Sequence, residues 1–131
     1  MYGQLVCVGK QGFYILAARS LRLLVRITEG NQRGDFLILR GLSVVSPSLG
    51  ISGKCDVVEF HADPAGVPLR GEEGLWLPYP VEYKRGKPKP HQADELQLCA
   101  QAMCLEEMLC CSIPEGSLYY GETRRRTRVP L

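Results

Sequence analysis

The pattern of hydrophobic and polar residues predicts a helix, strands, a second helix and further strands, in that order. From about residue 11 to residue 26, apolar side chains recur at helical spacing between arginines, which predicts an amphipathic helix. The run DFLILRGLSVVS, residues 35–46, is rich in branched aliphatic residues and contains Gly41, as an extended or bulged strand would. A turn is expected next, at PSLGISG.

The middle of the chain predicts two short strands joined by a long loop. KCDVVEF, residues 54–60, alternates enough to form a strand. Prolines and glycines crowd the stretch between Asp63 and Pro80, so residues 62–80 are predicted as a loop or a wide hairpin connection. PVEYK, residues 80–84, then has the pattern of a short strand.

The last third predicts a long helix and two more short strands. The helix should run from about residue 92 to residue 110 and end before Pro114 and Gly116. SLYYG and TRRRTRV follow it as strands joined near Gly121. The whole order predicts one domain over residues 1–131, in the α/β or α+β class, with one mixed sheet flanked by helices.

Composition and charge add little to the fold and function predicted from the pattern of residues. The chain has 45% hydrophobic and 23% charged residues, which is ordinary for a soluble globular domain, and its net charge of +2 does not by itself indicate nucleic-acid binding. Two basic runs could lie beside phosphate or could be ordinary solvated surface. They are Lys84, Arg85, Lys87 and Lys89, and Arg124, Arg125, Arg126 and Arg128.

The cysteines and the hydropathy indicate a cytoplasmic protein. None of the six cysteines forms a C-x-x-C pair, and most lie in apolar runs, so we expect reduced, structural thiols. The sequence shows no signal-peptide pattern and no apolar run of the roughly 18 to 20 residues that would span a bilayer. We therefore expect cytoplasmic localisation and no contact with a membrane.

Three charged residues are the best candidates for chemistry. The two-residue period of a strand places Glu82 and Lys84 on the same face. An antiparallel return from the strand of Asp56 could bring that carboxylate beside Glu82, so that both bind one magnesium or manganese ion, while Lys84 orients a water or stabilises a phosphate. Alone, this D-x(n)-E-x-K spacing is a weak signal, because Glu82 and Lys84 could equally form a surface contact.

Other polar residues leave alternatives open. Asp94, Gln97 and Gln101 form a polar stripe on the second helix, which either hydrogen-bonds these carboxylates or a phosphate, or faces water. His61 and His91 are the only histidines, so the sequence does not favour a catalytic triad or a multi-histidine zinc site. In the loop, Trp76 and Tyr79 could stack on bases, although anchoring of the loop is the commoner role.

Three stretches occurring together resemble the CRISPR-associated RecB-like exonucleases of the Cas-four family. They are GLSVVSPSLGISGKCDVVEFH, PVEYKRGKPKPHQADELQLCAQAMCLEEML and IPEGSLYYGETRRR, and the likeness covers roughly residues 35–129. The resemblance implies a restriction-endonuclease-like PD-(D/E)xK core, with Asp56 and Glu82 as metal-binding acids, Lys84 as the catalytic lysine and Gln97 as the glutamine of the following helix. Gln101 stands where many relatives carry tyrosine.

The family resemblance also implies an activity, cofactors and partners. Members use Mn²⁺ or Mg²⁺ to degrade single-stranded DNA ends, and they help the CRISPR integrase complex process and select new spacers in antiviral defence. They also hold a 4Fe-4S cluster through four cysteines.

Two departures distinguish this chain from those relatives. The N-terminal segment, residues 1–34, is a divergent helical segment that lacks the F-C-x-R-Q cysteine, and TEGNQRGDF lacks the histidine of E-G-x-x-x-H. No group of three cysteines follows the final strands before Leu131, so the 4Fe-4S cluster is expected to be absent. The departures leave two alternatives open: a catalytically impaired DNA-binding or integrase-interaction module, and a non-functional fragment.

Overall fold

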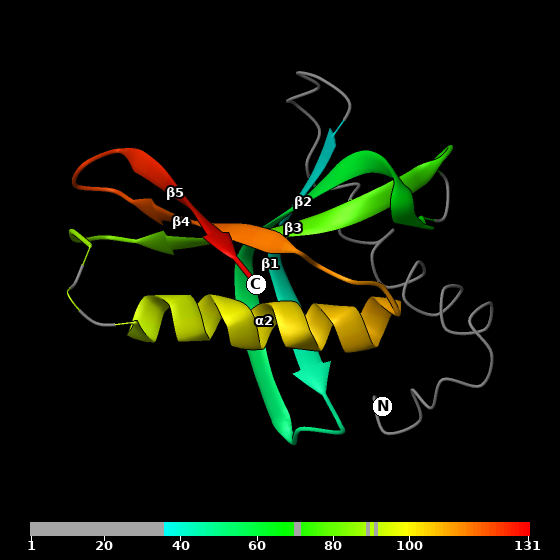
Figure 1. Cartoon of the computed structure of the whole chain (residues 1–131), viewed down its shortest axis with the longest axis horizontal. Coiled ribbons are helices and arrows are strands. Elements are labelled where there is room, and N and C mark those ends of the chain that lie inside the picture. Colours follow the sequence, from blue (N-terminus) through cyan, green and yellow to red (C-terminus); the bar gives the residue numbers. More distant parts are fainter. Residues whose placement is uncertain (1–35, 70–71, 89, 91) are drawn as a thin grey trace.

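The described part of the chain is a mixed five-stranded sheet with a helix packed across one face (Figure 1), an α/β arrangement. The computed structural model describes residues 36–69, 72–88, 90 and 92–131. The helix expected over residues 11–26 lies outside them. The strands are hydrogen-bonded in the order β1-β2-β3-β4-β5. The elements are β1 (Phe36–Ser46), β2 (Ile51–Pro68), β3 (Leu75–Lys84), α2 (Ala93–Leu109), β4 (Glu115–Tyr120) and β5 (Arg125–Pro130).

Of the two alternatives predicted for residues 62–80, the long loop is wrong, whereas the hairpin is right in that these residues join β2 to β3, although most of them lie within the two strands. β2 continues to Pro68 and β3 already begins at Leu75. Pro78 and Pro80 are tolerated because their spacing of two places both missing N–H groups on the same edge of β3. β2 pairs with β3 without a break across both prolines, whereas β4 pairs only with residues 81–84. The edge of β3 that lacks the two N–H donors is therefore the one that has no partner strand at these positions.

A bulge in β2 accommodates the remaining turn-forming residues. The register with β3 shifts between Ala62 and Val67, so residues 63–66 are extra on the β2 side. Asp63 Oδ1 accepts a hydrogen bond from the Ala65 N–H at 2.7 Å, which closes a local turn. Gly66 has no room for a side chain, since a Cβ there would lie 2.2 Å from the carbonyl carbon of Trp76. The sequence signals for a turn therefore mark a bulge inside a long strand.

The strand predicted over residues 35–46 is confirmed as β1, and a glycine changes which of its side chains face the core. Leu39 is buried before Gly41, whereas Leu42 and Val44 are buried after it. Gly41 has φ of 64°, a left-handed conformation that residues with a Cβ rarely adopt. The side chains that face the core are therefore at odd positions before Gly41 and at even positions after it. β1 stays in register with β2 on both sides of this glycine.

Helix α2 confirms the helix predicted over residues 92–110 and explains the parallel pairing of β3 with β4. It connects the two strands, as the helix of a βαβ unit does. Leu98, Leu105 and Leu109 repeat at helical spacing and are buried. The helix ends because Cys110 takes a left-handed conformation with φ of 51°, well before Pro114. No helix in the described part of the chain has the length and apolar character needed to cross a membrane.

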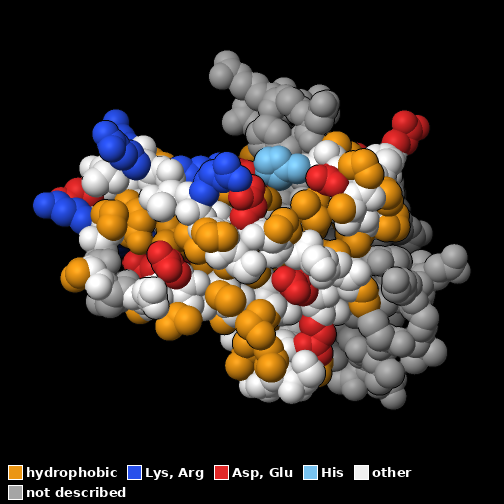
Figure 2. Space-filling model, viewed as in Figure 1, with side chains coloured by type: hydrophobic (Ala, Val, Ile, Leu, Met, Phe, Trp, Pro, Cys, Tyr) orange, Lys and Arg blue, Asp and Glu red, His pale blue; other side chains and the backbone are white. Residues whose placement is uncertain are grey.

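Basic side chains gather at one end of the molecule, over the β4–β5 hairpin and the end of β3 (Figure 2). The described residues of the two basic runs lie at the end of β3, in the segment after it, and on the β4–β5 hairpin. Several of them pair with acids: Lys87 with Glu122, Arg126 with Glu59, and Arg128 with Glu115. Those pairs neutralise part of the positive charge that the sequence places in this region.

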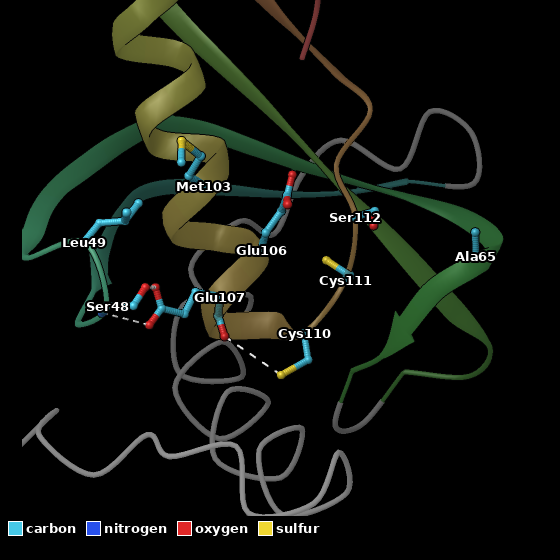
Figure 3. Close-up of a pocket in the computed structure, with 9 residues that line it drawn as sticks. All are labelled: Ser48, Leu49, Ala65, Met103, Glu106, Glu107, Cys110, Cys111 and Ser112. Carbon is cyan, nitrogen blue, oxygen red and sulfur yellow. Dashed lines mark hydrogen bonds between the residues drawn. The ribbon is translucent and has the colours of Figure 1, made fainter.

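At the opposite end of α2, Glu107 fastens the helix to the turn between β1 and β2. Its carboxylate accepts hydrogen bonds from the backbone N–H of Ser48 at 3.1 Å, from the Ser48 hydroxyl at 2.8 Å, and from the Ser46 hydroxyl. Figure 3 shows this contact at the edge of an open hollow of about 870 Å³, which Met103 and Cys111 also line. Because the serines already occupy the Glu107 carboxylate, the hollow is best understood as the groove between helix and turn.

Replacing this carboxylate should destabilise the fold in a pH-dependent way. Hydrogen bonds from Ser46 and Ser48 lower the pKa of Glu107, so its stabilising contribution is present above the ordinary carboxyl pKa and is lost as pH falls through the lowered value. We expect Glu107→Gln to reduce the free energy of unfolding by about 0.5–1 kcal/mol at neutral pH. Thermal unfolding should show the gap to wild type closing in acid. The control Glu95→Gln, at an exposed site on the same helix, should show no such closing gap; a constant Glu107→Gln gap at all pH values would refute the assignment.

Candidate metal and phosphate site

Asp56 and Glu82 lie together where β2 and β3 separate. Val57 pairs with Val81, and the pairing of the two strands goes no further toward the end of β3. Asp56 Oδ2 instead accepts a hydrogen bond from the backbone N–H of Tyr83 at 3.0 Å. The expectation that an antiparallel return brings Asp56 beside Glu82 is therefore confirmed. Asp56 is exposed, whereas Glu82 is only 5% exposed.

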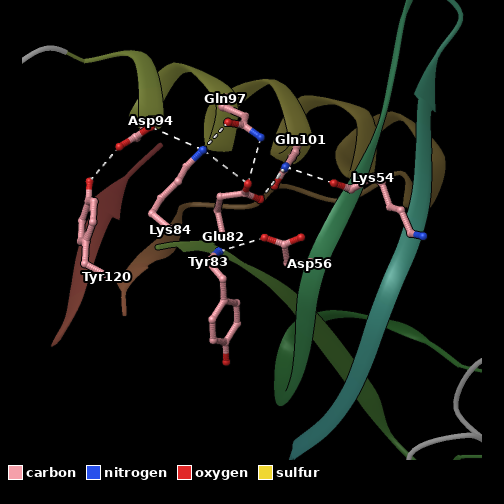
Figure 4. Close-up of polar contacts among 9 residues, drawn as sticks. All are labelled: Lys54, Asp56, Glu82, Tyr83, Lys84, Asp94, Gln97, Gln101 and Tyr120. Atoms are coloured by element: carbon pink, nitrogen blue, oxygen red, sulfur yellow. Dashed lines mark hydrogen bonds and ion pairs between the residues drawn. The ribbon is translucent and has the colours of Figure 1, made fainter. Parts of the chain in front are cut away.

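Two amides from α2 hold the Glu82 carboxylate (Figure 4). Gln97 Nε2 donates to Glu82 Oε1 at 2.9 Å, and Gln101 Nε2 donates to Glu82 Oε2 at 2.8 Å. Gln101 Nε2 also lies 3.3 Å from the carbonyl oxygen of Lys54 on β2. Of the two sequence-based alternatives for the polar stripe of α2, the one in which it hydrogen-bonds the carboxylates is thus confirmed. Glu82 has both oxygens oriented by these contacts.

Lys84 is held on the same side of β3 by three groups (Figure 4). Its Nζ donates to Gln97 Oε1 at 2.6 Å, and it lies 3.4 Å from Asp94 Oδ1 and 3.6 Å from Glu82 Oε1. The Tyr120 hydroxyl donates to Asp94 Oδ2 at 3.2 Å. Sequence reasoning missed Tyr120, although the two-residue period of SLYYG predicts that Leu118 and Tyr120 share a face. The ammonium is therefore fixed near Glu82 rather than free in solvent.

The electrostatics of Glu82 suit a cation. Burial raises the pKa of Glu82 and the negative charge of Asp56 raises it further, while hydrogen bonding from Gln101 and the charge of Lys84 act in the opposite direction. Gln101 Oε1 is also buried without a hydrogen-bond partner among the described residues. Two neighbouring carboxylates offer only oxygen donors, which magnesium and manganese prefer, so Asp56 and Glu82 fit such an ion with its other positions open to water or phosphate.

The other residues considered from sequence take structural places. The described cysteines are free thiols, and burial, together with the charge of Glu82, raises the pKa of Cys55 to about 12, so this thiol stays protonated. Trp76 packs against the core and donates through Nε1 to the Glu73 carbonyl at 3.0 Å, and the Tyr79 hydroxyl contacts Ser117 Oγ at 2.5 Å. Anchoring is therefore their observed role. Cys7, Lys89 and His91 lie outside the described residues.

His61, Glu59 and Arg126 form a separate cluster on the face of the sheet opposite α2. Arg126 donates two hydrogen bonds to Glu59, at 2.9 and 2.8 Å, and lies 5.2 Å above the Tyr79 ring. His61 Nε2 is 3.0 Å from Glu59. Burial raises the pKa of Glu59, but the hydrogen bonds and charges of Arg126 and His61 together outweigh it, so the pKa of Glu59 is lowered. The cluster braces β2 against β5 and does not reach Glu82.

The comparisons with known proteins assign no family. No protein-family model matches the chain, and a search of curated proteins gives no match either. The geometry of the site is therefore what indicates its chemistry. That geometry presents two adjacent carboxylates, one of them exposed, with an ammonium 3.6 Å from the buried one.

Proposed function

We propose that the chain is a divalent-metal-dependent nuclease of the PD-(D/E)xK, restriction-endonuclease-like type. The observation that carries the proposal is the network in which Gln97 and Gln101 orient Glu82 and Gln97 positions Lys84, beside the carboxylate of Asp56. A surface pair formed by chance would not have both carboxylate oxygens and the ammonium fixed by one helix. The mixed sheet with its β3–α2–β4 crossover is compatible with such a core.

Each residue has a distinct part in phosphodiester hydrolysis. Asp56 and Glu82 would hold Mn²⁺ or Mg²⁺, which when bound acidifies water and offsets negative charge on the phosphate. Lys84 places its ammonium beside the reacting phosphate, where it orients the attacking water or stabilises the developing charge. Gln97 holds the Lys84 ammonium in place, and Gln101 fixes the second oxygen of Glu82.

The substrate and setting follow from the resemblance of the motifs. We infer that the enzyme degrades single-stranded DNA ends in the cytoplasm and works with the CRISPR integrase complex in antiviral defence, where it processes and selects spacers. The 4Fe-4S cluster of the family has no part in this proposal.

The proposal is tested by cleavage of end-labelled single-stranded DNA with Mn²⁺ or Mg²⁺. Wild type should degrade the labelled strand. Asp56→Ala should do so at least about tenfold more slowly, because it removes a proposed metal ligand, and loss of a group that merely orients such a ligand already commonly costs about ten- to a hundredfold. Chelation should abolish cleavage by wild type. Equal rates for Asp56→Ala and wild type would remove Asp56 from the mechanism.

A second candidate function is a DNA-binding or integrase-interaction module that does not cleave. It is favoured by the small number of metal ligands, since the described residues contain no group of three or more His, Cys, Asp or Glu side chains placed to hold a metal ion. Under this alternative, wild type binds DNA in a manner that weakens with added salt. It then cleaves nothing with either metal.

A further inference from the structure

Tyr83 and Tyr119 form an aromatic pair on the face of the sheet opposite α2, in which Tyr83 is exposed and Tyr119 is half-buried. They are register partners on β3 and β4, and their ring centroids lie 5.0 Å apart with planes tilted by 49°. Glu82 and Lys84 point toward α2, so Tyr83 between them must point away, as Figure 4 shows. Tyr83 is 46% exposed, so a large part of its ring is open to solvent.

Tyr83 lies immediately beside Asp56, one of the two proposed metal ligands. The backbone N–H of Tyr83 donates to Asp56 Oδ2 at 3.0 Å, so Asp56 and the base of the Tyr83 side chain adjoin the same gap between β2 and β3. If a phosphate of a nucleic-acid strand is bound at Asp56, the base next to that phosphate lies near Tyr83. The ring therefore lies where an unpaired base could stack on it.

Positive charge flanks the same end of β3. Arg85 and Lys87 follow the strand, and Arg124 and Arg125 lie at the tip of the β4–β5 hairpin; all four are exposed. Lys87 pairs with Glu122 at 3.7 Å, so the three arginines supply most of the net positive charge here. The two segments are adjacent, because a Cβ on Gly121 would lie within 3.9 Å of Arg85. Figure 2 shows basic side chains gathered at this end. Cations beside an exposed aromatic surface are the combination that binds single-stranded nucleic acid, in which phosphates meet the cations and bases stack on the rings.

We infer that Tyr83, supported by Tyr119, is a stacking platform for an unpaired base next to the phosphate held at Asp56. The inference rests on the proposed nuclease function, and it adds a physical basis for the choice of single strands. A base inside a duplex is stacked between its neighbours and presents no free face to Tyr83. Tyr83 is thus a positioning residue for the substrate and takes no part in the bond-breaking step.

The test is binding of a labelled oligothymidylate by fluorescence anisotropy, without divalent metal, compared with an abasic strand of equal length. Tyr83→Ala should weaken binding to oligothymidylate by between about fivefold and a hundredfold, since stacking contributes about 1–3 kcal/mol per base. Tyr83→Phe should keep wild-type affinity, and Tyr83→Leu should lose it despite similar apolar bulk. The abasic strand should bind wild type and Tyr83→Ala equally, because it offers phosphates but no bases.

Leu75→Ala provides a matched control, as Leu75 is a 40% exposed residue at the other end of β3. It should leave affinity unchanged. The inference is overturned if Tyr83→Ala binds oligothymidylate like wild type, or if it loses affinity equally for the abasic strand. Failure of the proposed function gives a different result, namely Tyr83-dependent binding by a wild-type protein that cleaves nothing with Mn²⁺ or Mg²⁺.

Discussion

Glu82→Gln is expected to lose at least about a hundredfold of the metal-dependent cleavage rate while it remains folded. The substitution keeps the shape of the side chain but removes the charge that would attract the cation, and charge-stabilising groups in active sites commonly contribute factors of this size. One end of the new amide would also present N–H groups to Gln97, Gln101 or Lys84, which are themselves donors toward Glu82. The measurement is the initial cleavage rate on end-labelled single-stranded DNA.

This variant should stay folded, because two effects on its stability oppose each other. Burial raises the pKa of Glu82, which means that the folded state disfavours its ionised form, so a neutral side chain relieves a desolvation cost at neutral pH. An amide N–H that faces the donors Gln97 and Gln101 loses a hydrogen bond and offsets part of that gain. Glu73→Gln, the same chemical change at an exposed position in the turn before β3, is the matched control and should cleave like wild type. A Glu82→Gln protein that cleaves at the wild-type rate would contradict the role given to Glu82.

Phe60→Ala is expected to produce the largest loss of stability, about 3–5 kcal/mol in the free energy of unfolding. Phe60 is completely buried in the main core, where its strand β2 lies between β1 and β3. Truncation removes apolar contacts and leaves a cavity that the surrounding strands can only partly close. Because domains of ordinary size have only about 5–15 kcal/mol in total, a large part of the margin would be lost. Urea unfolding followed by circular dichroism measures the change.

The comparison variant for this prediction is Leu96→Ala. Leu96 lies on α2 but is 66% exposed, so its truncation should change the free energy of unfolding by no more than about 0.5 kcal/mol. Similar losses for Leu96→Ala and Phe60→Ala would mean that β2 does not form the centre of the core.

The sequence predicts the fold well where hydrophobic periodicity is strong, and poorly where prolines are read as breaks. Helix α2 and strand β1 were predicted within a few residues, because their apolar spacing matches the helical and strand periods. Residues 62–80 were predicted as a loop or a wide hairpin connection because the four prolines and three glycines of this stretch resemble turn signals. The missing N–H donors of Pro78 and Pro80 would matter only if a neighbouring strand needed them. That depends on the pairing of β4, which no local sequence pattern reveals.

The candidate site was predictable in its acids and lysine, but not in its supporting contacts. The period of a strand places Glu82 and Lys84 together, and the hairpin adds Asp56. The hydrogen bond from Tyr120 to Asp94 depends on where β4, which follows α2 in the sequence, lies against that helix. The Tyr83–Tyr119 pair depends on the parallel register of β3 with β4. Contacts of this kind arise from tertiary packing, so spacing along the chain carries little information about them.

The central claim is that Asp56 and Glu82 together bind a divalent cation that serves DNA cleavage. The most direct measurement is a titration of Mn²⁺ followed by electron paramagnetic resonance, on wild type and Glu82→Gln with Glu73→Gln as control. Wild type and the control should each bind Mn²⁺ at a site that Glu82→Gln lacks. Equal Mn²⁺ binding by all three proteins, or none by wild type, would contradict the claim.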